Sequence, residues 1–189
     1  MATLDGNYID PMNVSARQTG IRWGLIWGLI SSLLMILTHF AGLDTINGKN
    51  TFLLLIPTLA TIGGIIFCIS SAQKQHRDEE LGGYMTLSRG VLVGLWVGLI
   101  SGAIVLVFAF FFYSFIAKDF FENMTEGMVQ QMEQLGQDGD KVRTQLEESK
   151  WRYSPGMLAI QSFFVKTIGG LFWGLIVGLF TKRESSKPF

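Results

Sequence analysis

Four long apolar runs constrain this chain more than any other feature of its sequence. They cover about residues 23–40, 52–71, 90–117 and 158–181. About 20 helical residues are needed to cross the roughly 30 Å hydrocarbon core of a bilayer. Within lipid, each backbone N–H and C=O must be paired inside its own segment. The runs also lack the polar face of an amphipathic helix. We therefore predict an all-α fold, a four-helix transmembrane bundle.

The remaining residues divide into two tails and one long polar connection. Residues 1–20 are predicted to be a disordered tail, residues 184–189 a second tail, and residues 21–183 the membrane domain. Because an early apolar core and a cleavage site are missing, we expect the first span to act as an uncleaved signal anchor.

Within the membrane domain, residues 118–157 are predicted to form a short helical insertion between the third and fourth spans. Apolar residues recur there at helical spacing until Gly136, and Asp138 or Asp140 is placed to cap a second helix. Pro155 stands where the fourth helix can begin. We expect two short helices that either pack on each other or lie on the membrane surface.

The distribution of basic residues near the span ends predicts the orientation. One side of the membrane carries eight of them, namely Arg17, Arg22, Lys74, Arg77, Arg89, Lys182, Arg183 and Lys187. The other side carries four, namely Lys49, Lys118, Lys150 and Arg152. Because cytoplasmic loops are enriched in Lys and Arg, both termini are predicted to be cytoplasmic and the insertion to lie outside the cytoplasm.

Two pairs of similar stretches predict an internal duplication. Residues 24–31 (GLIWGLIS) resemble residues 94–101 (GLWVGLIS), and the TIGG of residues 61–64 recurs at residues 167–170. The chain would then consist of two parallel helical hairpins, the second carrying the insertion. Coincidence is the alternative, because Gly-Leu-Ile strings are common in membrane helices.

Rows of small residues four apart mark three of the spans. The row members singled out for helix packing are Gly24, Gly28, Ser32, Gly90, Gly94, Gly98, Gly102, Gly170, Gly174 and Gly178. Residues at this spacing share one helix face, and small side chains there allow two backbones to approach closely. We expect packing inside one chain, with a homo-oligomer or membrane-protein partner as the alternative.

Two ionisable residues within the spans are candidate contacts for lipid or solute. Lys166 lies about a third of the way along the fourth span, and its stem is predicted to carry the amine to the outer surface. The alternative is a buried lysine that contacts an anionic lipid or a substrate. His39 lies near the outer end of the first span, where an interfacial role is expected.

The sequence carries no catalytic, cofactor-binding or metal-binding motif. The net charge of zero gives no field for nucleic acid. The single cysteine, Cys68, excludes a disulfide framework. His76 stands beside the acidic run 78–80 in a polar loop, which we interpret as solvated rather than as a metal site. We therefore predict neither a cofactor nor enzymatic activity.

Several stretches resemble a family of membrane proteins. They are residues 83–90 (GYMTLSRG), residues 111–120 (FFYSFIAKDF), the Met- and Glu-rich residues 132–148, and the fourth span with its Thr-Lys-Arg ending. The chain resembles domain-of-unknown-function family 4199, which is common in the Bacteroidetes. This resemblance implies a bacterial inner-membrane protein with four helices and an outer insertion. It implies no activity and no catalytic residues.

Three functional hypotheses follow from the sequence. The first is a non-enzymatic accessory or assembly protein that acts through helix packing and its outer segment. The second is a small channel or carrier for neutral or lipidic solutes, since the spans lack acidic residues. The third, a membrane enzyme that acts on lipid, has the least support because no two candidate residues share a motif.

Overall fold

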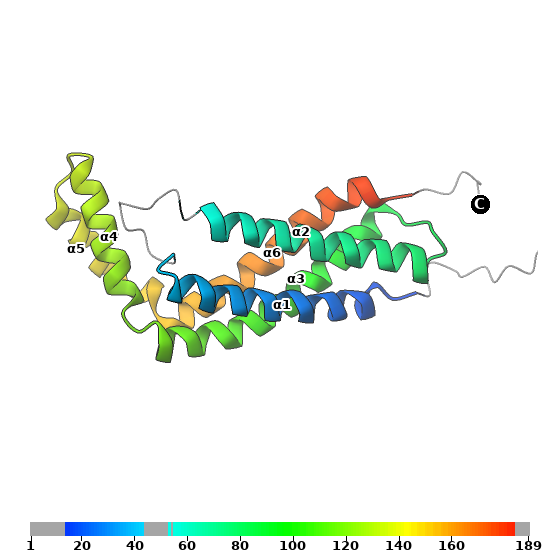
Figure 1. Ribbon diagram of the computed structural model, residues 1–189, viewed down its shortest axis with the longest axis horizontal. Coiled ribbons are helices and arrows are strands. Elements are labelled where there is room, and N and C mark those ends of the chain that lie inside the picture. Colours follow the sequence, from blue (N-terminus) through cyan, green and yellow to red (C-terminus); the bar gives the residue numbers. More distant parts are fainter. Residues whose placement is uncertain (1–13, 44–52, 54, 184–189) are drawn as a thin grey trace, which may run out of the picture.

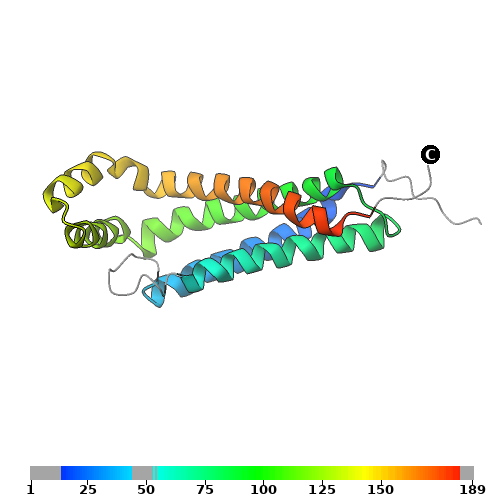
Figure 2. The same ribbon diagram turned by 90° about the horizontal axis from the view of Figure 1, so that it is seen from above.

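Four long helices run side by side in alternating directions and form the body of the protein (Figures 1 and 2). The computed structural model describes residues 14–43, 53 and 55–183. The long helices are α1 (Ala16–Phe40), α2 (Leu55–Gln75), α3 (Leu87–Phe111) and α6 (Pro155–Thr181). Each is long and apolar enough to cross a bilayer, which confirms the all-α four-helix transmembrane bundle.

All four helices extend beyond the apolar runs of the sequence, and α1 and α2 extend furthest. Helix α1 begins at Ala16, inside the stretch assigned to a tail, where the hydroxyl of Ser15 caps it by accepting from the backbone N–H of Arg17 at 3.3 Å. Helix α2 reaches Gln75 and continues as the π-helical turn η2 (His76–Glu80). The hydropathy pattern marks where a helix leaves the apolar region, whereas its backbone hydrogen bonds continue through polar residues.

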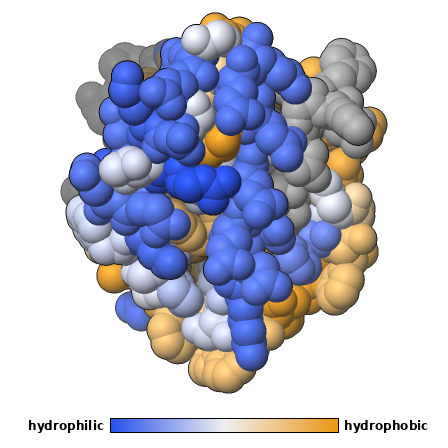
Figure 3. All heavy atoms as spheres, turned by 90° about the vertical axis from the view of Figure 1, so that its left-hand side faces the viewer, coloured by the Kyte–Doolittle hydropathy of each residue, from blue (hydrophilic) through white to orange (hydrophobic). Residues whose placement is uncertain are grey.

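The predicted helical insertion is confirmed and occupies one end of the bundle, here called the insertion end. It consists of α4 (Phe120–Gln134), α5 (Gly139–Glu148) and the 3-10 helix η4 (Lys150–Tyr153). Helices α4 and α5 pack against each other. The link between them contains Gly136, whose φ of 79° requires glycine, and Asp138, whose carboxylate caps α5. Figure 3 shows that hydrophilic residues cover most of this end.

The opposite end, where α1 begins and α6 ends, is called the terminal end (Figure 1). There the backbones of Met85 and Arg183 exchange two hydrogen bonds, of 2.9 and 3.0 Å. This pairing joins the turn before α3 to the residue just beyond α6.

Helices α3 and α6 are in backbone contact along their glycine rows. A Cβ atom added to Gly94 would lie 2.5 Å from the Cα of Gly174, and one added to Gly98 would lie 3.0 Å from the Cα of Gly170. At the two ends of this seam, Gly90 faces Gly178 and Gly102 faces the carbonyl of Phe163. No larger residue fits the centre of the seam, so close dispersion contacts between backbones hold this pair together.

Helices α1 and α3 are in contact in a different way, because glycine on one meets isoleucine on the other. A Cβ atom on Gly24 would lie 2.7 Å from Cβ of Ile100, and one on Gly28 would lie 2.7 Å from Cδ1 of Ile104. Ser32 is buried and donates its hydroxyl to the carbonyl of Gly28 at 2.9 Å. The small-residue rows therefore lie between helices of the same chain.

Helix α2 packs closely only along its second half. Ile65, Cys68, Ile69 and Ala72 are buried, whereas residues 55–63 are almost all exposed. The ring of Trp27 projects from α1 against Gly64, where an added Cβ would lie 2.6 Å from Cη2 of the ring and nearer still to Cζ3. This ring fills the space between α1 and α2 at mid-length, and the space toward the insertion end is the candidate site.

Candidate functional site

A cavity of about 550 Å³ lies between the first half of α2 and the other three long helices. Its volume is within the range of roughly 300–1,000 Å³ that is usual for small-molecule sites. The lining residues are Ser31, Leu34, Met35, Thr38, Pro57, Thr58, Thr61, Ile62, Val105, Tyr113, Leu158, Gln161, Ser162, Val165 and Lys166. They come from the parts of α1, α2, α3 and α6 nearest the insertion end, and from Tyr113 just beyond α3.

Lys166 lies deep in this cavity and points into the bundle. Its Nζ donates to Oγ of Ser31 at 2.9 Å and lies 4.7 Å from the centre of the Trp27 ring. Lys166 is the twelfth of 27 residues in α6, so it lies roughly 16 Å along the helix from its start at 1.5 Å per residue. The prediction that this amine reaches the outer surface is wrong. The Ser31 hydroxyl and the Trp27 ring provide partners inside the bundle, which compensate for the missing water.

The charge of Lys166 is not balanced by a carboxylate in the cavity, since no lining residue is acidic. The Trp27 ring that Nζ faces is fully buried, and its Nε1–H has no hydrogen-bond partner among the described residues. A buried donor without an acceptor costs about 1–3 kcal/mol.

The cavity hydroxyls of Thr38, Thr61 and Ser162 use their hydrogens within their own helices. These three donate to the carbonyls of Met35, Pro57 and Leu158, at 3.0, 2.8 and 2.8 Å. Their oxygens then face the cavity as acceptors. The amide of Gln161 likewise donates to the carbonyl of Arg152 at 3.1 Å. Lys166 is the one cationic residue among the described residues that line this space.

Packed side chains fill the bundle between Trp27 and the terminal end. One apolar core there includes four fully buried side chains, namely Trp27, Ile69, Val93 and Val97. Beyond that core, the buried amide of Gln73 donates to the carbonyls of Gly90 and Gly174, each at 2.9 Å, and accepts from the hydroxyl of Thr181 at 2.5 Å. In this structure the cavity thus ends at Lys166.

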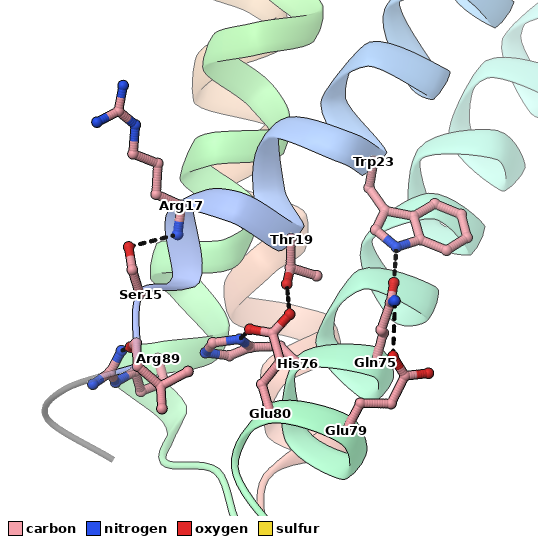
Figure 4. Close-up of polar contacts among 10 residues, drawn as sticks. Ser15, Arg17, Thr19, Trp23, Gln75, His76, Glu79, Glu80 and Arg89 are labelled. Carbon is pink, nitrogen blue, oxygen red and sulfur yellow. Dashed lines mark hydrogen bonds and ion pairs between the residues drawn. The ribbon is translucent and has the colours of Figure 1, made fainter. Parts of the chain in front are cut away.

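A second polar cluster ties α1 to η2 at the terminal end (Figure 4). Nδ1 of His76 lies 2.7 Å from Oε2 of Glu80, and the other oxygen of Glu80 accepts from the hydroxyl of Thr19. Nearby, Nε1 of Trp23 donates to Oε1 of Gln75 at 2.8 Å. These contacts join the start of α1 to the end of α2.

The interpretation of His76 as part of a solvated loop is wrong. Its side chain is fully buried, because α2 continues as η2 and turns the imidazole toward Glu80. Among the described residues, no group of three or more His, Cys, Asp or Glu side chains is placed to hold a metal ion. The cluster is a structural contact between helices.

The second candidate, His39, lies outside the cavity lining, so the structure does not bring it together with Lys166. Its ring makes edge contacts with Phe112 at 5.2 Å and Phe40 at 5.6 Å between ring centres. His39 therefore belongs to an aromatic group near the insertion end.

Sequence reasoning did not single out Trp27 or Gln73. Trp27 stands inside the first of the two similar stretches, where the second has Val97 at the equivalent position. That difference was a usable signal, because tryptophan for valine within a repeat changes the space between helices. Gln73 gave no comparable signal, since it stands in a polar stretch at the end of a span.

The four apolar helices and the cavity between them define a multi-pass integral membrane protein. A family model described as "Protein of unknown function (DUF4199)" matches residues 22–183. The chain belongs to this family, as the resemblance predicted. No curated protein and no solved structure gives a significant match.

Proposed function

We propose that this protein is a non-enzymatic accessory protein of the bacterial inner membrane that holds an amphiphilic molecule in the Lys166 cavity. The observation that carries the proposal is the placement of Lys166. An ionisable residue at membrane depth is costly, and such residues commonly mark a pathway or a ligand site. Here the amine faces a cavity of ligand size rather than the surface.

The walls of the cavity suit a molecule with both polar and apolar parts. Seven lining residues are apolar, namely Leu34, Met35, Pro57, Ile62, Val105, Leu158 and Val165. Hydroxyl oxygens are interspersed among them, as in small-molecule sites that combine apolar walls with a few polar groups. Because the first half of α2 is exposed, a chain can enter sideways from the surrounding lipid.

The proposed orientation places both termini in the cytoplasm. Five basic residues at the terminal end support it, because basic residues favour the cytoplasmic side. They are Arg17, Arg22, Lys74, Arg77 and Arg89. The hydrophilic insertion end would then face the periplasm, and the cavity would receive its ligand from the outer leaflet.

Holding a ligand fits the geometry better than the rival activities. A channel or carrier needs a path past Trp27 and the Gln73 contacts, and this structure has packed side chains there. An enzyme that acts on lipid needs a nucleophile and a base in reach of each other. The cavity lining contains hydroxyls and one lysine, without histidine or carboxylate.

A pair of matched tryptophan variants tests the proposal. Thr61→Trp fills the cavity from α2, whereas Leu59→Trp places the same ring on the exposed side of the same helix, where Leu59 is 64% exposed. Native mass spectrometry of detergent-solubilised protein mixed with laurate, dodecanol or a single-chain phospholipid would measure saturable one-to-one adducts. We expect an adduct for the wild type and Leu59→Trp and its loss in Thr61→Trp. No saturable adduct with any of these probes in the wild type would refute the proposal.

A further inference from the structure

We propose that the molecule held in the cavity is a single-chain anionic amphiphile whose acid group pairs with Lys166. This inference rests on the proposed function and specifies the chemistry of its ligand. It places the acid deep in the cavity, beside Ser31 and Trp27, with the hydrocarbon chain along the apolar wall that leads to the surface.

The first argument is the missing counter-charge. Nζ of Lys166 has one hydrogen bond, to the neutral hydroxyl of Ser31, and one contact with the face of Trp27. No acidic residue lines the cavity. An ammonium group in apolar surroundings is stabilised most by an anion that it can contact directly.

The second argument is the unused N–H of Trp27. The ring that Lys166 covers is fully buried, and its Nε1 has no acceptor among the residues that the structure describes. Buried polar atoms of this kind are rare and call for an explanation, such as a bound group that the protein alone does not supply. An acid group that contacts Nζ of Lys166 would lie next to this ring, because Nζ is 4.7 Å from its centre.

The third argument fixes which way the ligand lies. The hydroxyls of Thr38, Thr61 and Ser162 have donated their hydrogens to backbone carbonyls, so they present lone pairs. Lone pairs repel an acid group at these three positions, whereas the ammonium group of Lys166 attracts it. A cationic amphiphile would meet the Lys166 charge and is rejected.

Two headgroups share this chemistry, a carboxylate and a phosphate monoester. A fatty acid carries the first, and a single-chain alkyl phosphate carries the second. The cavity volume of about 550 Å³ favours one hydrocarbon chain, because it corresponds to a drug-sized ligand. Laurate and dodecyl phosphate have chains of equal length, so their comparison separates the two sources.

The test compares probes of equal chain length that differ in charge. Native mass spectrometry would give dissociation constants for laurate, dodecyl phosphate, dodecanol and dodecyltrimethylammonium. For the wild type we expect at least one of the two acids to bind about tenfold or more tightly than dodecanol, because hydrogen bonds to charged groups are the stronger ones. The cationic probe should bind most weakly.

Variants at Lys166 locate the effect. Lys166→Met keeps the length of the side chain and should remove the preference for acid over alcohol while leaving dodecanol bound. Lys166→Gln is a second neutral variant in case the first does not fold. Lys118→Met is the control, because Lys118 is an exposed lysine outside the cavity.

The outcomes separate this inference from the proposed function. If acids and dodecanol bind the wild type equally, or if Lys166→Met and Lys166→Gln keep the preference for acid, the cavity holds an amphiphile but the inference about charge is wrong. If no probe binds at one-to-one stoichiometry, the proposed function itself fails.

Discussion

The two helical hairpins of this protein pack in opposite ways, although the sequence suggests a common origin. In the α3–α6 pair, glycine meets glycine, and Gly94 would place a Cβ 2.5 Å from the Cα of Gly174. In the α1–α2 pair, Gly64 meets the ring of Trp27, and the first half of α2 stays exposed. One pair provides a rigid seam, and the other leaves the space that becomes a cavity. The comparison teaches that one bulky residue at a helix crossing can convert a packing face into a binding site.

The largest effect is expected from a substitution in the glycine contact between α3 and α6. Gly94→Val puts a branched side chain against the backbone of α6, which cannot move without separating the two helices. We expect destabilisation of about 3 kcal/mol or failure to fold. Thermal unfolding in detergent would measure it, using a thiol-reactive fluorophore that labels the single cysteine, buried Cys68, when the bundle opens. A variant as stable as the wild type would show that the seam does not hold the fold.

The second-largest expected effect concerns Gln73, whose side chain joins α2 to α3 and α6. Gln73→Leu removes the hydrogen bonds from α2 to Gly90 and Gly174 and leaves the hydroxyl of Thr181 without Gln73 as its acceptor. We expect a loss of about 2 kcal/mol, in the range for buried polar groups that lose a partner. The same unfolding assay would measure it, with exposed Gln130→Leu on α4 as the control. Equal stability of the two variants would contradict the account.

A smaller effect is expected where glycine meets a side chain rather than a backbone. Gly64→Val collides with the Trp27 ring, but the first half of α2 has room to move away. We therefore expect a cost of about 1 kcal/mol, clearly below that of Gly94→Val. If Gly64→Val lowered the stability more than Gly94→Val, the distinction between the tightly packed α3–α6 pair and the less closely packed α1–α2 pair would be wrong.

The smallest effect serves as a baseline for the series. Gly63 is exposed and has no neighbour within 4 Å of an added Cβ. Gly63→Ala should cause no loss of stability and a gain of at most about 0.5–1 kcal/mol, because alanine favours a helix interior over glycine. A large loss here would mean that α2 makes contacts in the membrane that this single chain does not contain, such as contacts with a second copy.

The architecture was predictable because it depends on local properties of the chain. Apolar run length sets where helices cross a membrane, and Pro155, Gly136 and Asp138 mark helix ends through backbone conformation and capping. These signals act within a few residues, so they can be read without knowing which helices are neighbours.

The cavity was not predictable, because it depends on which side chains meet across the bundle. The direction of Lys166 follows from Ser31 and Trp27 on another helix, far away in the sequence. The burial of His76 follows from a π-helical turn that brings it to Glu80, which in turn accepts from Thr19 on α1. Considered alone, Lys166 and His76 are expected to reach water, because they are polar and lie toward the ends of the spans. Packing against other helices buries them instead.

The most direct test of the central claim compares two cysteines at nearly the same depth of α6. Ser162→Cys places a thiol in the cavity, and Phe164→Cys places one on the exposed surface, which faces lipid tails. With Cys68 replaced by alanine, the rate of reaction with a small anionic methanethiosulfonate would be measured in lipid nanodiscs. The account predicts faster modification of Ser162→Cys, slowed by added laurate. Equal rates at the two positions, or no reaction at Ser162→Cys alone, would contradict an accessible cavity beside Lys166.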